Sequence, residues 1–97
     1  MTDRDRIVTI CGSMRHYNQM LALANELTLV GFIVLMPFVL KIDDPGKDEE
    51  LQRLHRDKID LSGAIYVVGT PGESTREEIA YATSQGKKVL TMWEGNP

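Results

Sequence analysis

The chain has 97 residues, of which 42% are hydrophobic and 26% are charged, and its formal net charge at pH 7 is −3. This composition excludes a disordered chain, which has fewer apolar residues and a larger net charge, and the length predicts one domain over residues 1–97. Nucleic-acid backbones are bound by basic faces, so the acidic balance predicts a small-molecule ligand and no nucleic-acid partner.

Cys11 is the only cysteine, so the chain cannot form the internal disulfides that are typical of small secreted domains. The N-terminus is too polar for a signal peptide, and no apolar run reaches the ~18 residues that a membrane span needs. We therefore expect a cytoplasmic protein without a membrane partner. A chain of this length buries a modest core, so we also expect a homodimer or a higher homo-oligomer.

The first half of the chain alternates buried strands with an amphipathic helix. Residues 7–11 form a short, nearly continuous apolar run that predicts a strand buried on both faces. Apolar residues then recur at helical spacing over residues 17–30, and Gly31 is suited to end that helix. Residues 32–36 predict a second strand, which stops at Pro37 because proline cannot donate to a strand ladder.

The second half continues the alternation. Turn-forming residues at 43–46 precede a charged segment, and residues 48–62 predict a helix with Leu51, Leu54 and Leu61 on one inward face. The remaining predicted elements are a strand at 64–68, a helix at 74–85 and a strand at 88–92.

This order of elements predicts an α/β fold. Strands that alternate with helices of this length form a parallel sheet with helices on both faces. We predict a small flavodoxin-like or Rossmann-like three-layer sandwich with about four strands in the order 2-1-3-4. Such sheets bind ligands beyond the carboxyl ends of their strands, here after strands one and three. Those ends carry residues 11–15 and 69–75.

The segment Gly12-Ser13-Met14-Arg15 is a candidate binding loop. It joins a buried strand to a helix, so its backbone N–H groups and the positive helix end suit an anion such as a phosphate. Ser13 and Arg15 add side-chain donors. The structural alternative is an ordinary turn in which Ser13 caps the helix. Tyr17 is better placed than most aromatic residues to stack on a base or to cover a subunit contact, although helix packing is the simpler explanation.

Glu78 and Asp57 are candidate catalytic carboxylates. Both Ser74 with Glu77 and Thr75 with Glu78 fit the spacing of a capping box. If Ser74 is the cap, Glu78 lies beside the apolar stripe and faces the cleft. Asp57 shares the predicted inward face of its helix, where it either pairs with a basic residue or faces Glu78. Paired carboxylates suit glycosidic chemistry, in which one attacks the anomeric carbon and the other assists the leaving group.

We expect neither a metal nor another cofactor. His16 and His55 are far apart in the sequence and match no ligand spacing. Cys11 is interpreted as a small buried core residue, because the sequence shows no histidine paired with it.

Three segments together resemble the nucleoside 2-deoxyribosyltransferase superfamily, which includes the 2′-deoxynucleoside 5′-monophosphate N-glycosidases. They occur in the family's order and cover most of the chain. The segments are Ile10-Cys11-Gly12-Ser13-Met14-Arg15, His55-Arg56-Asp57, and Gly72-Glu73-Ser74-Thr75-Arg76-Glu77-Glu78-Ile79-Ala80-Tyr81-Ala82.

The resemblance implies an activity and a role for each matching residue. It implies cleavage of the N-glycosidic bond of a (deoxy)nucleoside or its 5′-monophosphate, with transfer to water or another base. Glu78 falls on the family's nucleophile and Asp57 on its assisting aspartate. The residues that fall on phosphate contacts are Gly12, Ser13, Arg15 and Ser74.

The chain also departs from the family pattern. Thr9 stands where some members carry a tyrosine, and the chain is shorter than most members. Two alternatives to an enzyme therefore stay open. One is a non-catalytic nucleotide-binding or nucleotide-sensing module of the same fold, and the other is an interaction subunit with a vestigial pocket.

Overall fold

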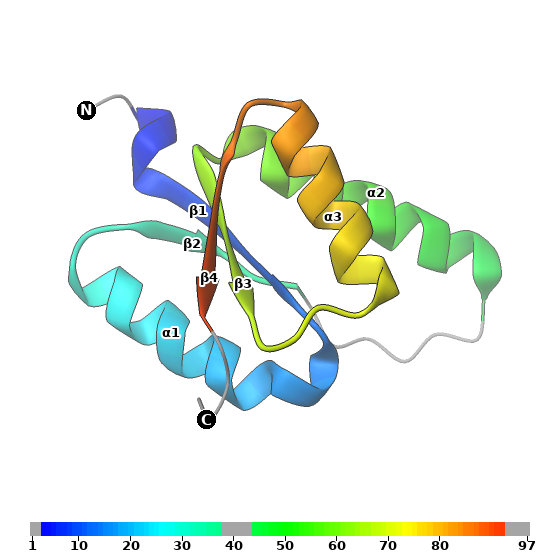
Figure 1. Ribbon diagram of the computed structural model, residues 1–97, viewed down its shortest axis with the longest axis horizontal. Helices are drawn as coiled ribbons and strands as arrows, with labels where there is room; N and C mark the ends of the chain where they lie inside the picture. The colour runs from blue at the N-terminus through cyan, green and yellow to red at the C-terminus, as the bar shows by residue number, and fades with distance from the viewer. Residues whose placement is uncertain (1–2, 38–43, 93–97) are drawn as a thin grey trace.

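Four parallel strands form one sheet in the order β2-β1-β3-β4 (Figure 1). The structure is a computed structural model that describes residues 3–37 and 44–92. The predicted strand order is confirmed. The strands are β1 (Ile7–Gly12), β2 (Ile33–Leu35), β3 (Ala64–Val68) and β4 (Lys88–Met92).

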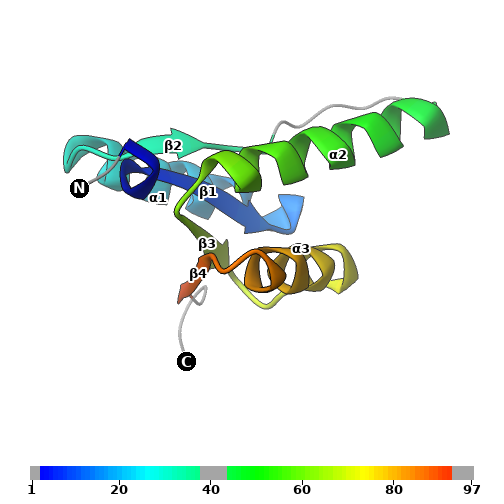
Figure 2. The same cartoon turned by 90° about the horizontal axis from the view of Figure 1, so that it is seen from above.

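Three α-helices complete a three-layer sandwich. Helix α1 (Tyr17–Leu29) covers one face of the sheet, and α2 (Pro45–Leu61) and α3 (Glu73–Ser84) cover the other (Figures 1 and 2). Short 3-10 helices, η1 (Asp3–Arg6) and η2 (Met14–His16), flank β1. The predicted α/β class is thereby confirmed. Within residues 3–37 and 44–92, no helix combines the length and apolar character needed to cross a membrane.

Strand β1 contributes to two separate hydrophobic cores. Successive side chains of a strand point to opposite faces of the sheet, so neighbouring residues of β1 pack against different helices. Ile10 is fully buried and packs with Met20 on the α1 side. Cys11, also fully buried, packs with Ile59 and Ala82 on the side of α2 and α3. The nearly continuous apolar run of residues 7–11 follows from this two-sided burial.

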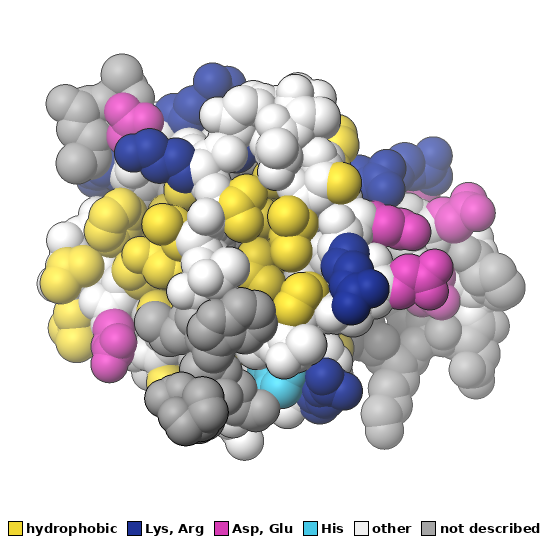
Figure 3. Space-filling view, viewed as in Figure 1, with side chains coloured by type: hydrophobic (Ala, Val, Ile, Leu, Met, Phe, Trp, Pro, Cys, Tyr) yellow, Lys and Arg dark blue, Asp and Glu magenta, His cyan; other side chains and the backbone are white. Residues whose placement is uncertain are grey.

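The side of the molecule that carries β4 has an apolar surface. Figure 3 shows hydrophobic side chains on both sides of this edge strand, and Leu90 within it is 40% exposed. Leu21, on α1, is exposed to a similar extent. The expectation of a homo-oligomer stays a prediction.

Helix α2 begins earlier than predicted. Asp44 is its N-cap, and the Asp44 carboxylate accepts hydrogen bonds from the backbone N–H groups of Gly46 and Lys47. Proline is favoured at the first helical position because its missing N–H would have no helical partner there. The predicted turn residues Asp44 and Pro45 therefore start the helix.

The predicted inward face of α2 is wrong. Leu54 and Leu61 are 54% and 61% exposed, whereas His55 and Ile59 are buried. The helix is rotated so that the buried stripe against the sheet starts one residue after Leu54. Two leucines consequently lie away from the core, and Asp57 is exposed with them.

Helix α3 also starts before its predicted first residue. Gly72 is the N-cap, no side chain caps the helix, and the Gly72 carbonyl accepts from the Arg76 N–H at 2.9 Å. Neither predicted capping box forms, because Ser74 and Thr75 both lie inside the first turn. Ser74 is exposed and Thr75 is buried.

Thr9 links β1 to the end of α2. Its hydroxyl is fully buried, donates to the Lys58 carbonyl at 3.0 Å and shares a hydrogen bond with the Ser62 hydroxyl. A tyrosine at this position would have to displace the C-terminal turn of α2. The departure from the family pattern at Thr9 is thus compatible with the way α2 docks on the sheet.

Gly69, directly after β3, combines a positive φ of 77° with close packing. A Cβ atom at Gly69 would lie 2.5 Å from the imidazole of the buried His16, whereas Gly86 has a similar φ of 74° and open space around it. We predict that Gly69→Ala lowers the free energy of unfolding by about 2–4 kcal/mol and Gly86→Ala by about 1 kcal/mol.

Denaturant unfolding of the two variants checks this prediction. Because both glycines have nearly the same φ, the difference between the variants isolates the steric contact with His16. Equal losses in the two variants would contradict it.

Candidate functional site

A cavity of about 810 Å³ opens beyond the carboxyl ends of the strands, between the loop after β1, α2 and the start of α3. Its volume lies within the range of small-molecule sites. The position agrees with the ligand site expected for this sheet order. The lining residues are Gly12, Ser13, Met14, Pro37, Asp48, Leu51, Gln52, Leu54, His55, Asp57, Lys58, Leu61, Gly72, Glu73, Ser74, Thr75 and Glu78.

Five of the seven predicted site residues lie on the wall of this cavity. They come from three separate parts of the chain and are Gly12, Ser13, Asp57, Ser74 and Glu78.

The other two, Arg15 and Tyr17, are not among the residues that line it. The Arg15 Nε donates to the His16 Nε2 at 3.2 Å, and Tyr17 is half-buried at the start of α1. Ser13 lines the cavity and also caps η2, where its hydroxyl accepts from the Arg15 N–H at 3.4 Å. Ser13 therefore caps a helix, as the structural alternative expects, and it also lines the cavity.

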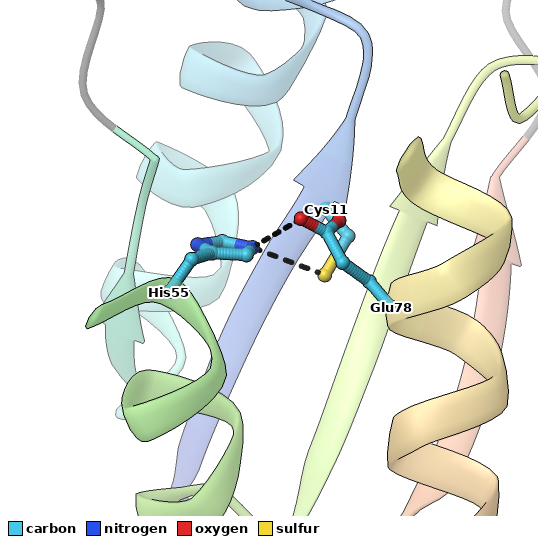
Figure 4. Close-up of side chains that lie close together, drawn as sticks. All are labelled: Cys11, His55 and Glu78. Carbon is cyan, nitrogen blue, oxygen red and sulfur yellow. Dashed lines mark hydrogen bonds and ion pairs between the residues drawn. The ribbon is translucent and has the colours of Figure 1, made fainter. Parts of the chain in front are cut away.

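Cys11, His55 and Glu78 meet at the inner end of the cavity (Figure 4). The Cys11 Sγ and the His55 Nε2 are 3.5 Å apart, and the His55 Nε2 and the Glu78 Oε2 are 3.6 Å apart. Cys11 is a buried core residue, as interpreted, but it does have a histidine beside it, which the sequence does not show. His55 lies four residues before the buried Ile59 on α2, and Cys11 points from β1 towards the same helix.

Burial raises the pKa of Glu78 to about 7. The side chain is 21% exposed, and water that would stabilise its charge is largely excluded. A hydrogen bond from the Cys11 thiol and the positive charge of Arg56 act in the opposite direction but are smaller. About half of the Glu78 carboxyl groups are therefore ionised near neutral pH.

His55 and Cys11 are both neutral near pH 7. Burial, followed by the charge of Lys58, lowers the pKa of His55 to about 4. Burial, followed by the nearby Glu78 carboxylate, raises the pKa of the Cys11 thiol far above its usual range. Within the described part of the chain, the buried Nδ1 of His55 has no hydrogen-bond partner.

Lys58 is a further cavity residue, which the sequence did not single out for the site. Its ammonium group donates to the Met36 carbonyl at 2.6 Å, at the end of β2, and burial lowers its pKa. The side chain also lines the cavity. It brings a positive charge to the same wall as Asp57.

Comparison of the chain with protein-family models and with curated proteins gives no match in either case.

The raised pKa of Glu78 makes stability depend on pH. The folded-state pKa of about 7 lies above the ordinary value of 4.5, so the folded protein binds this proton more tightly than the unfolded chain. The stabilisation that the Glu78 proton gives to the folded protein is fully present below pH 4.5 and is lost as the pH rises through about 7. We predict that the free energy of unfolding of Glu78→Gln, taken relative to that of wild type, rises by up to about 3 kcal/mol from acid to mildly alkaline pH.

Denaturant unfolding at a series of pH values, with a chelator present, measures this difference. Glu77→Gln is the matched control, because Glu77 is the exposed neighbour on the same helix and its charge is the smallest of the influences on the pKa of Glu78. His55 titrates in both proteins, so its effect largely cancels in the comparison. A stability difference that does not change with pH would show that Glu78 has an ordinary pKa.

Proposed function

We propose that this protein cleaves the N-glycosidic bond of a (deoxy)nucleoside or its 5′-monophosphate, with Glu78 as the nucleophile. The observation that carries the proposal is the place of Glu78, a largely buried carboxylate on the wall of a ligand-sized cavity that also contains Asp57. The family resemblance falls on these same two residues. Five of the seven residues assigned from sequence line this one cavity.

The proposed reaction has two steps. The ionised Glu78 carboxylate attacks C1′ of the sugar, the bond between C1′ and the base nitrogen breaks, and its electron pair leaves with the base. Asp57, on the same wall, assists the departure of the base, and that nitrogen takes a proton from water. A water molecule then attacks C1′ of the glycosyl ester, Asp57 accepts its proton, and the Glu78 carboxylate is released.

The surroundings of Glu78 suit a nucleophile. A carboxylate that is mostly removed from water is poorly solvated when ionised, and less solvent has to leave before it attacks. The Cys11 thiol lies within 4.8 Å of the carboxylate and favours its ionised form. Because the pKa of Glu78 is about 7, the rate is expected to rise with pH through that value as the ionised form accumulates.

The mouth of the cavity suits a polar or phosphorylated end of the substrate. Ser13 and Ser74 line it, and the first turn of α3 brings backbone N–H groups to the wall. Lys58 adds a positive charge. Glu73 lines the same turn and opposes an anion there, so Ser13 and Lys58 are the better phosphate contacts. Leu54 and Leu61 offer an apolar surface for a base.

A non-catalytic nucleotide-binding module is the second candidate. It is favoured by the internal contacts of Glu78, whose carboxylate lies 3.6 Å from the His55 Nε2 and takes a hydrogen bond from the Cys11 thiol. In such a module the ligand would occupy the same cavity, and Glu78 would serve structure alone.

Incubation with a panel of deoxynucleosides and their 5′-monophosphates tests the catalytic proposal. We predict that wild type releases free base from at least one of them and that Glu78→Gln lowers the rate by about 10³-fold or more. Glu77→Gln, the matched carboxylate on the same helix, is expected to retain the wild-type rate.

Chromatography of the free base provides the measurement. Base release by Glu78→Gln at the wild-type rate would exclude Glu78 as the nucleophile. Binding of a nucleotide by wild type without any release of base would replace the enzyme by the nucleotide-binding module.

The role of Asp57 gives a separate prediction. Asp57→Asn removes the proposed assisting carboxylate and is expected to lower base release by about 10²- to 10⁴-fold. Asp60→Asn is its control, because Asp60 is an exposed acid on the same helix that accepts from the Tyr81 hydroxyl and does not line the cavity. Steady-state rates of both variants check this, and equal rates in the two would remove Asp57 from the mechanism.

A further inference from the structure

Cys11, His55 and Glu78 bring three different ligand types to one point. The Cys11 Sγ, the His55 Nε2 and a Glu78 carboxylate oxygen all lie within 4.8 Å of one another. The three side chains come from β1, α2 and α3 and converge on a common point (Figure 4). Cys11 is fully buried, and the side chains of His55 and Glu78 are 10% and 21% exposed.

We propose that these three side chains form a binding site for a thiophilic divalent cation, with zinc as the first candidate. Zinc binds thiolate, imidazole and carboxylate ligands at about 2.0–2.3 Å in tetrahedral geometry. Two such ligands on one ion therefore lie roughly 3.4–3.6 Å apart. The separations of 3.5 Å between Cys11 and His55 and of 3.6 Å between His55 and Glu78 match that spacing, and Cys11 and Glu78 lie within 4.8 Å of each other.

Charge balance supports the site. On binding, the Cys11 thiol gives its proton to solvent and ligates as the thiolate, Glu78 ligates as the carboxylate, and neutral His55 ligates through Nε2. Two negative ligands cancel the double positive charge of the ion, so the buried complex carries no net charge. Ligation through Nε2 also fixes the remaining proton of His55 on Nδ1.

The fourth coordination position faces the cavity. His55 and Glu78 both line the cavity, so an ion held between them is accessible to water or to a donor atom of a small ligand. Three protein ligands with one open position are the pattern of zinc sites that bind an exchangeable ligand. The site is assembled from three distant segments, which explains why no ligand spacing is visible in the sequence.

Occupancy of this site blocks the proposed glycosidase. Where the proposed function holds, a Glu78 carboxylate bound to zinc is unable to attack C1′, so zinc acts as an inhibitor of base release. The binding site itself does not depend on that function, because its evidence is the geometry of the three ligand atoms.

Titration of the metal-free protein with Co²⁺, followed by displacement with Zn²⁺, tests the site. Cobalt reports on its ligands, and we expect a thiolate-to-cobalt charge-transfer band and the visible bands of a tetrahedral ion, both saturating at one ion per chain. Cys11→Ser is expected to lose the charge-transfer band. Glu78→Gln is expected to bind at least about tenfold more weakly, whereas Glu77→Gln binds like wild type.

Glu78→Gln keeps the test decisive if Cys11→Ser does not fold, because Glu78 is partly exposed. Absence of the bands in wild type, or the same affinity in Glu78→Gln and Glu77→Gln, would overturn the metal site.

Base release with and without zinc separates the site from the proposed function. Cobalt binding by a wild type that releases no base under any condition retains the metal site and removes the glycosidase. Base release by wild type without cobalt binding retains the glycosidase and removes the metal site. Base release that is unaffected by saturating zinc would show that the ion does not engage Glu78 and would overturn the proposed ligand set.

Discussion

The two-sided burial of β1 is the constraint on which the rest of the structure depends. Its alternating side chains hold α1 through Ile10 and hold α2 and α3 through Cys11. Because β1 lies between β2 and β3, the chain crosses to one side of β1 to form β2 and then to the other side to form β3. The cavity opens at that point, and Cys11 at its inner end belongs to the core and to the site at once.

Much of the fold could be predicted because its signals are local. β-branched apolar runs bounded by glycine or proline identify the strands, and their alternation with helices leaves few topologies for a sheet of this size. The rotation of α2 was predicted wrongly because Leu54 and Leu61 look like core residues, yet they line a cavity. The start of α3 was missed because Gly72 caps it without a side chain.

The candidate site was predictable only where a family pattern supplied long-range information. Glu78 and Asp57 came from that pattern, and both line the cavity. The contact between Cys11 and His55 joins residues 44 positions apart, which no periodicity can reveal. Removing three titratable groups from water also costs folding energy, and the raised pKa of Glu78 reflects that cost.

The exposed leucines of α2 bear on how a ligand would be recognised. Leu54 and Leu61 stand on the cavity wall beside polar groups such as Asp57 and Lys58. A ligand with a flat apolar part and a polar part would cover both kinds of surface together. Its association would carry a negative heat-capacity change from the dehydrated leucines. Calorimetry over a range of temperatures would therefore distinguish a base seated on α2 from an anion held only at the start of α3.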